Sequence, residues 1–250
     1  MDIVYGIPNA ASLGPDFANV KYFFKSMSKQ FFVSNRNTHI GIIPYSDSAA
    51  LTVDLDSVYS REGIINAIDK LKPSGSQFNV AKAIQVAADN AFTIFGGTRP
   101  TAPKTFVLYI PSSRPEDAAA IKAASDKLKS VGVRLMVVGS EENVDFYRGV
   151  SSQPPQKHYL HGSYDKNAAG VFDAVDTICK ARYGTCPVGA QVKVDPGAEG
   201  CPSQDACSAD GDCKDPNHLC CEGCAKTCVP AVRSELHIWR FFFVQPSQSL

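Results

Sequence analysis

The first 178 residues of this 250-residue chain contain no cysteine, whereas all nine cysteines lie between Cys179 and Cys228. A cluster of this density is typical of a disulfide scaffold that forms in an oxidising compartment. We therefore expect a secreted protein with a cysteine-free domain over residues 1–180 and a cysteine-rich segment after it.

The chain also lacks an excess of charge, because 25 acidic residues balance 25 Lys and Arg residues. Without a basic excess, nucleic acid is not an expected partner. The sequence has no run of about 20 apolar residues, so we expect no membrane-spanning helix. No signal sequence follows Met1 and no Asn-x-Ser/Thr sequon occurs, so we expect a mature or trimmed product without N-glycosylation.

Motifs for phosphate binding and nucleophilic catalysis are missing as well. The first apolar run is not followed by Gly-x-Gly-x-x-Gly, and Gly-x-x-x-x-Gly-Lys does not occur. Ser12 has no assignable base, and we expect His158 and His161 to be solvated or hydrogen-bonded structural residues. The sequence therefore predicts neither enzymatic activity nor a cofactor.

What the sequence does contain is an alternation of unbroken apolar runs with amphipathic segments. Strand-like runs occur at 2–7, 38–45, 49–53, 105–110, 133–138 and 157–160, and helical spacing at 16–31, 57–71, 79–92, 116–131, 144–150 and 168–180. This order predicts a Rossmann-like, doubly wound α/β fold with a mostly parallel six-stranded sheet, plus a small disulfide-rich domain. Residues 49–53 follow a short polar turn and should form the one antiparallel edge strand.

Residues 8–14 form a small-residue loop directly after the first apolar run. Because that run is not amphipathic, we expect a central strand that is covered on both faces. Open α/β sheets bind ligands at the carboxyl ends of their strands, near the topological switch point. The sequence therefore predicts that the functional site includes this loop.

Residues 2–180 resemble the von Willebrand factor A domain, which is also called the integrin I domain. The resemblance rests on the order and spacing of short motifs: Asp2-Ile-Val, Ser60-Arg-Glu-Gly, Val80-Ala-Lys-Ala-Ile, Arg99 before Pro103-Lys104, the passage Lys127 to Leu135, and Tyr147-Arg-Gly-Val. It implies a Mg²⁺ site at the apex of the sheet, built from an Asp-x-Ser-x-Ser loop, a Thr and a second Asp. The corresponding positions in this chain are Pro8, Ala10, Ser12, Phe78 and Pro111.

Only Ser12 among these five positions keeps an oxygen. Since Mg²⁺ requires a near-octahedral set of oxygens, we expect a degenerate site that binds no metal. A shift of the second loop by a residue or two would offer Gln77 or Asn79 as a ligand, but it would restore neither carboxylate.

The loss of oxygen ligands leaves an apolar patch at the apex, which could seat an apolar or proline-bearing partner. The residues of this predicted apex patch are Asn9, Ser12, Phe78, Pro111, Ser112 and Ser113. An alternative stays open, in which Phe78 tucks inward and the loops only close the top of the sheet.

Residues 186–230 resemble the four-disulfide core of whey acidic proteins. The resemblance is carried by Cys207-Ser-Ala-Asp-Gly-Asp-Cys213, the adjacent Cys220-Cys221 and Cys228-Val-Pro230, although the first gap is long and Glu222-Gly223 is one residue short. It implies the pairs Cys186–Cys221, Cys201–Cys224, Cys207–Cys220 and Cys213–Cys228. Spacing alone leaves on the order of 100 pairings open.

Three further features of the second half carry predictions. Cys179 is left over and is either a free thiol or part of an intermolecular bridge, while a zinc site involving His218 is disfavoured because zinc thiolates suit reducing compartments. Residues 181–200 are a linker and the start of the cysteine-rich segment, and Lys193 lies in the loop that would inhibit a serine protease. Residues 231–250 form an aromatic tail, which we expect to dock on a domain, with partner binding or self-association as alternatives.

These features together predict a secreted, non-catalytic extracellular-matrix or adhesion protein that binds matrix components, such as collagen-like fibres, without a metal. A domains occur in byssal threads, mollusc shells and other invertebrate matrices, so the resemblance implies such a setting. The alternative is a serine-protease inhibitor that acts through the cysteine-rich domain. The oligomeric state is left open.

Overall fold

The computed structural model describes residues 1–111, 117–139, 143–153, 155–161, 169–180, 218–221 and 227–230. Contacts within the chain divide it into two compact units, Met1–Arg182 and Tyr183–Leu250. Each unit is described by itself.

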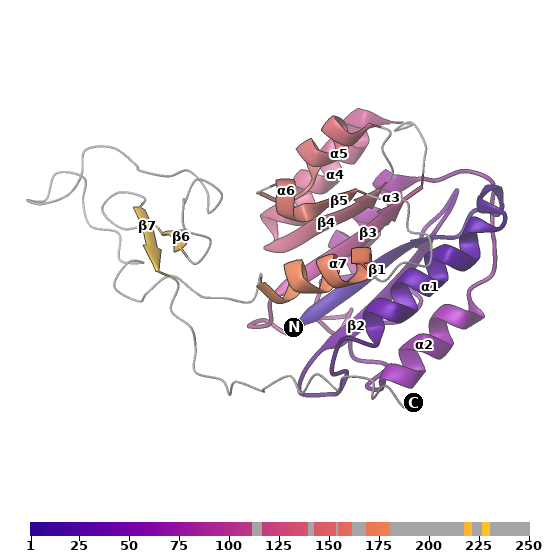
Figure 1. Cartoon of the computed structure of the whole chain (residues 1–250), viewed down its shortest axis with the longest axis horizontal. Coiled ribbons are helices and arrows are strands. Elements are labelled where there is room, and N and C mark those ends of the chain that lie inside the picture. The colour runs from indigo at the N-terminus through magenta and orange to yellow at the C-terminus, as the bar shows by residue number, and fades with distance from the viewer. Residues whose placement is uncertain are drawn as a thin grey trace, which may run out of the picture. The chain divides into compact units, whose positions relative to one another are not determined.

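The first unit is built on five parallel strands in the order β2-β1-β3-β4-β5 (Figure 1). The strands are β1 Asp2–Pro8, β2 His39–Tyr45, β3 Lys104–Ile110, β4 Val133–Gly139 and β5 Tyr159–His161. The chain passes from β1 to β2 on one side and then to β3 on the other side, which places the topological switch point between β1 and β3. The predicted α/β fold with a parallel sheet is confirmed, and the loop after β1 lies at the switch point.

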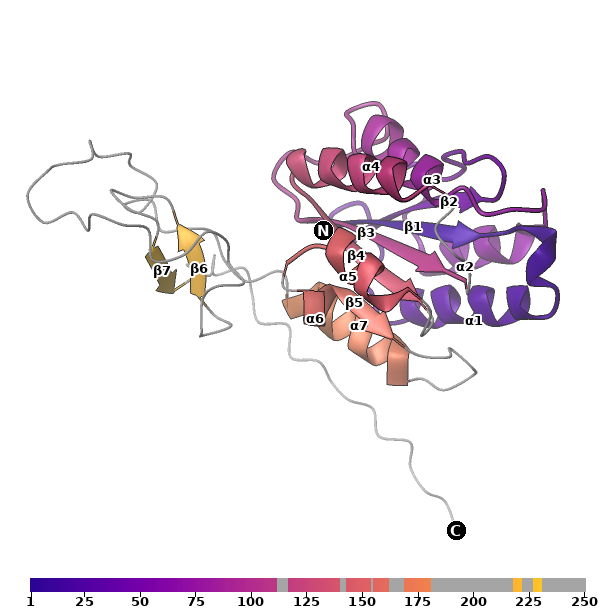
Figure 2. The same ribbon diagram turned by 90° about the horizontal axis from the view of Figure 1, so that it is seen from above.

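Helices cover both faces of the sheet, as Figures 1 and 2 show. The helical elements are η1 Ala11–Leu13, α1 Asp16–Ser28, α2 Arg61–Lys70, α3 Val80–Val86, the π-helical turn η2 Ala87–Ala91, α4 Ala118–Ser130, α5 Val144–Val150, α6 Pro155–His158 and α7 Ala169–Lys180. Side chains of α1, α2 and α7 pack on one face, and those of α3, α4 and α5 on the other. None of the helices in the described part of the chain is long and apolar enough to cross a membrane.

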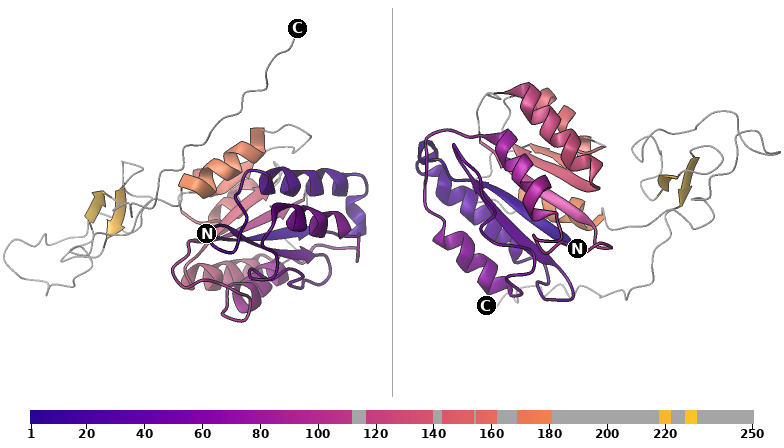
Figure 3. Two further views of the ribbon diagram at one scale, coloured as in Figure 1. Left: turned by 90° about the horizontal axis from the view of Figure 1, so that it is seen from below. Right: turned by 180° about the vertical axis from the view of Figure 1, so that it is seen from behind.

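The core explains why the strands read as unbroken apolar runs. In β1, Ile3, Tyr5 and Ile7 pack with α1, α2 and α7, whereas Val4 packs with the helices of the opposite face. Figure 3 shows the sheet between its two helical layers from below and from behind. Because both faces are covered, the middle of a central strand is a continuous apolar run.

The amino end of β1 is fixed by a buried ion pair between Asp2 and Arg99. The guanidinium Nε and Nη2 donate to Asp2 Oδ1 at 2.9 and 2.6 Å, and the backbone N–H of Arg99 donates to Oδ2 at 2.8 Å. Arg99 Nη2 also donates to the carbonyls of Met1 and Asn37, each at 2.7 Å. Arg99 therefore connects the start of the central strand β1 to the loop that precedes β3.

The expected antiparallel edge strand exists only as two isolated bridges, Tyr45 with Ala49 and Ile42 with Val53. The carbonyl of Ile42 accepts hydrogen bonds from both Thr52 N at 2.9 Å and Val53 N at 3.4 Å. Two residues thus face one residue of β2, and such a bulge interrupts a ladder. The described part of the sheet has five strands instead of the six expected.

Two predicted helices differ from those in the structure. Ser60 Oγ accepts the N–H of Gly63 at 3.1 Å, so the helix expected from residue 57 begins only after this N-cap. The helix expected over 79–92 divides into α3 and η2, because Phe92 N donates to Ala87 O at 3.0 Å with π-helical spacing.

The structure describes one element pair of the second unit, an antiparallel hairpin of β6 His218–Cys221 and β7 Thr227–Pro230. The register sets Cys220 opposite Cys228. The partners that the sequence resemblance gives to these two cysteines lie outside the described residues. The disulfide pattern therefore stays a prediction.

Candidate functional site

The loop after β1 ends the central strand and turns the chain into α1. Pro8 is buried and lies opposite Tyr45 in the β1–β2 register. Ala10 is fully buried, and the turn η1 then exposes Ser12. Gly14 closes this turn with a φ of 51°, in the left-handed region that favours glycine.

The second loop, residues 72–79, is shaped by a carboxylate from the turn after β2. Asp47 accepts the backbone N–H groups of Ser76 at 3.0 Å and Gln77 at 2.8 Å. Gly75 has a φ of 68°, and a Cβ at this position would collide with the Asp47 carboxylate. Asp47 and Gly75 together hold the loop in one conformation.

Direct hydrogen bonds join the first loop to the second. The carbonyl of Asn9 accepts Ser74 N at 2.7 Å, and the Asn9 side-chain amide donates to Lys72 O at 3.1 Å. Ala11 N donates to Gly75 O at 3.0 Å. Three hydrogen bonds between protein groups therefore join the two loops.

Phe78 lies at the end of the second loop and packs partly into the core. Its ring meets that of Tyr45 edge-on, with centroids 6.4 Å apart. The Tyr45 hydroxyl donates a hydrogen bond to the carbonyl of Tyr109. Burial is the main cause that raises the pKa of Tyr45 well above its ordinary value, and the nearby Tyr147 and Tyr109 raise it further. Phe78 is half-buried, so part of its ring closes the core and part faces outward.

The residues at the five expected ligand positions do not fit a hard divalent cation. Pro8, Ala10, Phe78 and Pro111 have no side-chain oxygen, and Ser12 supplies a single hydroxyl. Mg²⁺ needs near-octahedral coordination by oxygen. Within the residues that the structure describes, no group of three or more His, Cys, Asp or Glu side chains is placed to hold a metal ion.

The predicted apex patch exposes less surface than its sequence suggests. Asn9 is only 8% exposed, and its amide is used to join the loops. Ser12 is exposed, whereas Phe78 and Pro111 are half-buried. Among the predicted patch residues that the structure describes, Phe78 and Pro111 therefore contribute the apolar surface, and Ser12 contributes an exposed hydroxyl.

A hollow of ≈ 220 Å³ lies beside Phe78, between the beginnings of α3 and α4. Its polar lining consists of Asn79, Lys82, Gln85 and Asp117. Asp117 also caps α4, because its carboxylate accepts Ala120 N at 2.9 Å. Sequence reasoning missed this hollow, since it joins two helix starts that are far apart in the chain.

Several predicted sites lie outside the described residues: Ser112, Ser113, Cys186, Lys193, Cys201, Cys207, Cys213, Cys224 and residues 231–250. The side chains of Cys179, Cys220, Cys221, Cys228 and His161 are not described either. His158 is buried, at 5% exposure. The disulfide pairs, the inhibitory loop and the docking of the aromatic tail stay predictions.

Comparison with known protein families identifies the first unit. The family model described as von Willebrand factor type A domain matches residues 2–173. Matrilin-1 of Gallus gallus is 28% identical over 163 residues, which cover 64% of this chain and 32% of that protein. Von Willebrand factor A domain-containing protein 2 of Homo sapiens is 29% identical over 140 residues, 56% of this chain and 18% of that protein. The chain thus spans a third or less of these relatives.

Solved structures with the same fold include proximal thread matrix protein 1 from the mussel byssus. It superposes with a TM-score of 0.66 at 18% identity, over 78% of this chain and 50% of that chain. A second structure of the mussel protein is described with a zinc-occupied MIDAS motif, at a TM-score of 0.65 and 19% identity over the same shares. Manganese-loaded TRAP protein of Plasmodium vivax superposes with a TM-score of 0.58 at 16% identity, over 71% of each chain.

Proposed function

Because this chain belongs to the von Willebrand factor type A family, we propose that it is a secreted, non-catalytic extracellular-matrix protein. It binds matrix components through the apex of its A domain, without a metal and without a cofactor. A structural relative is named as a matrix protein of the mussel byssus, and this supports a matrix setting. The density of cysteines after residue 178 supports secretion.

The observation that carries the metal-free part of the proposal is the way the apex loops are held. The Asn9 carbonyl and Gly75 carbonyl accept backbone N–H groups from the opposite loop, and the Asp47 carboxylate accepts two backbone N–H groups of the second loop. An ion that bridges loops in other members of the family has few oxygens to bind here. The geometry of the apex therefore depends on protein hydrogen bonds, and recognition depends on the surface that those loops present.

Phe78 is the residue that offers this surface its largest apolar contact. Aromatic side chains that are partly buried and held in one orientation lose little conformational entropy on binding. Exposed Ser12 adds a hydroxyl that donates or accepts a hydrogen bond. Such a surface fits a proline-bearing fibre of the collagen type, whose backbone carbonyls accept hydrogen bonds and whose rings pack on aromatic faces.

Binding of the full chain to immobilised fibrillar collagen tests the proposal, with EDTA in one series and Mg²⁺ in the other. We expect equal binding in both series. We also expect Phe78→Ala to weaken binding about fivefold or more, which corresponds to roughly 1 kcal/mol of lost contact.

Phe32→Ala is the matched control for this experiment. Phe32 is 68% exposed and lies between α1 and β2, near the amino end of the sheet, so its loss leaves the apex unchanged. Far-ultraviolet circular dichroism checks that both variants are folded. Loss of binding in EDTA, or equal binding by the Phe78→Ala and Phe32→Ala variants, would contradict the proposal.

A further inference from the structure

The outer edge of the sheet lies beyond β2 and is covered by the edge segment, residues 49–54. Its isolated bridges to β2 lie at Ala49 and Val53. Between them, the backbone N–H and C=O groups of Leu51 have no hydrogen-bond partner in the described part of the chain. Unpaired backbone groups at a sheet edge are a template for pairing with another strand.

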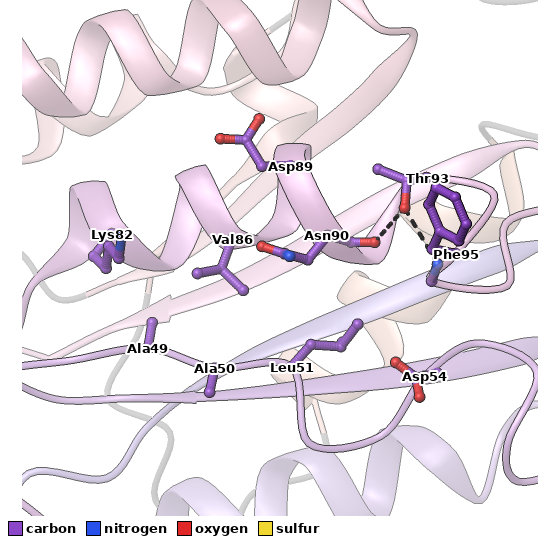
Figure 4. Close-up of a pocket in the computed structure, with 11 residues that line it drawn as sticks. Ala49, Ala50, Leu51, Asp54, Lys82, Val86, Asp89, Asn90, Thr93 and Phe95 are labelled. Atoms are coloured by element: carbon purple, nitrogen blue, oxygen red, sulfur yellow. Dashed lines mark hydrogen bonds between the residues drawn. The ribbon is translucent and has the colours of Figure 1, made fainter.

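A groove of ≈ 600 Å³ runs along this edge, between the edge segment and the elements α3 and η2 (Figure 4). Its middle is lined by Leu51 from below and by Val86 and Asn90 from above. Leu51 is only half-buried, so its apolar side chain is available in the groove. The groove therefore combines apolar surface with unpaired backbone.

The two ends of the groove carry opposite charges. Figure 4 shows Lys82 above Ala49 at one end and Asp54 below Phe95 at the other. No ion pair of Lys82 or Asp54 occurs among the described residues, whereas Asp89 is already paired with Lys127 at 2.5 Å. The groove thus has one unpaired cation and one unpaired anion, separated along the edge segment.

Phe95 lines the groove at the Asp54 end and is 97% exposed, and its chain neighbour Ile94, which does not line the groove, is 85% exposed. The loop that carries them is fixed, because Thr93 Oγ1 donates to Asn90 O at 2.7 Å and Leu55 N donates to Gly96 O at 3.0 Å. A fixed loop loses little conformational entropy when its exposed side chains become buried. Such a pair is well suited to be an anchor for a partner.

We propose that this edge is the interface of a symmetric dimer, in which the edge segments of two copies pair in antiparallel orientation. A two-fold axis near Leu51 brings Asp54 of each copy to the Lys82 end of the other copy's groove. The interface then contains two pairs of Lys82 with Asp54, one at each end. The exposed Phe95 of each copy is carried to the same end, where the groove gives it apolar surface.

The charges select this occupant among those that a sheet edge accepts. A partner that fits the groove brings an acidic group to Lys82 and a basic group to Asp54. A second copy in antiparallel orientation brings both at once, Asp54 from its edge segment and Lys82 from its α3. Antiparallel pairing also places the closely spaced hydrogen bonds perpendicular to both edge segments.

Sedimentation velocity of the full chain over a range of concentrations tests the dimer. A standard interface buries about 1,600 Å², and one edge pairing with a few apolar side chains buries less, so we expect dissociation in the range of about 10–100 μM. Lys82→Glu should weaken the dimer at least tenfold, because each Glu would face Asp54. Asp54→Lys should do the same by placing two cations together.

Mixing the two variants decides the question. A Lys82→Glu copy and an Asp54→Lys copy make two attractive pairs in a mixed dimer, so the mixture should dimerise although each variant alone stays monomeric. Lys70→Glu, an equal charge reversal at an exposed position of α2 on the other face, is the control and should leave dimerisation unchanged.

Three results would overturn the proposal: a wild-type chain that is monomeric at every concentration, a dimer that persists in both single variants, or a mixture that stays monomeric. A dimer held by a cysteine bridge would give the second result. Asp54 lines the groove and not the hollow beside Phe78, so Asp54→Lys leaves collagen binding by a monomer unaffected, and the two proposals fail separately.

Discussion

The buried ion pair at the start of β1 allows a quantitative prediction of stability. The side chain of Asp2 is 0% exposed and that of Arg99 is 27% exposed. Arg99→Met keeps most of the aliphatic length but removes the guanidinium from the carboxylate. The carboxylate then keeps only the backbone N–H of Arg99 and the Thr98 hydroxyl, at 2.8 and 3.3 Å.

The cost of this change follows from the burial of the carboxylate. Removal of one partner from a buried ion pair costs about 3–5 kcal/mol, because the remaining charge is desolvated and uncompensated. The partial exposure of Arg99 places the expected loss of unfolding free energy at the lower end, about 3 kcal/mol. For a domain of this size, the melting temperature should fall by about 6–12 °C.

A solvent-exposed ion pair provides the control. Lys122 and Asp126 are joined at 2.7 Å on α4, but their side chains are 69% and 51% exposed. Lys122→Met should cost about 0.3–0.5 kcal/mol, since water screens this pair. Thermal unfolding followed by far-ultraviolet circular dichroism measures both variants through the helices of the first unit.

The double change Asp2→Asn with Arg99→Met tests the physical cause. An uncharged amide in the interior needs no counter-ion, so the double variant should regain roughly 1 kcal/mol or more relative to Arg99→Met alone. Equal losses for Arg99→Met and Lys122→Met would refute the reasoning. Such a result would mean that Asp2 is hydrated in the folded protein.

Two further predictions concern cations and pH. Addition of about 10 mM Mg²⁺ or Mn²⁺ should leave the melting temperature unchanged, whereas a site with a Kd of about 1 mM would add about 1.4 kcal/mol and raise it by several degrees. Burial, with a smaller contribution from the Asp16 charge, raises the pKa of Tyr109 to about 12. Because a raised pKa favours the neutral phenol, its contribution to stability should be complete below pH ~10 and decline by about 1.4 kcal/mol per pH unit up to pH ~12. For Tyr109→Phe, the free energy of unfolding in urea should decline less steeply between pH ~10 and pH ~12, by about 1.4 kcal/mol per pH unit. An unchanged pH dependence would contradict the raised pKa of Tyr109.

The sequence predicted the parallel sheet because a strand that is buried on both faces is a continuous apolar run without alternating polar residues. Each residue from Ile3 to Ile7 in β1 is apolar or glycine, and all are buried in the structure. The position of the 8–14 loop at the switch point followed from the alternation of strands and helices. The order of elements in the sequence is therefore sufficient to place this loop at the carboxyl end of the central strand.

The edge of the sheet could not be predicted in the same way. A strand and a bulged segment share the same sequence pattern over residues 49–53, and the difference depends on one carbonyl, Ile42 O, that accepts two N–H groups. The groove is equally hidden, because its walls come from residues 49–54 and 82–96. Lys82 and Asp54 come to line the same groove only when the chain has folded.

At the apex, the residues that hold the loops in place differ from the residue that we propose makes the contact with a partner. Asn9, Asp47 and Gly75 make the hydrogen bonds and the turn that hold the loops, whereas Phe78 takes no side-chain part in those bonds. Loss of the Phe78 ring therefore removes a contact and leaves the loop framework in place. Loss of the Asn9 amide would instead loosen the framework, because Lys72 O would lose its donor. In the metal-free function proposed above, these hydrogen bonds would hold the loops in shape, and Phe78 would make the contact with the partner.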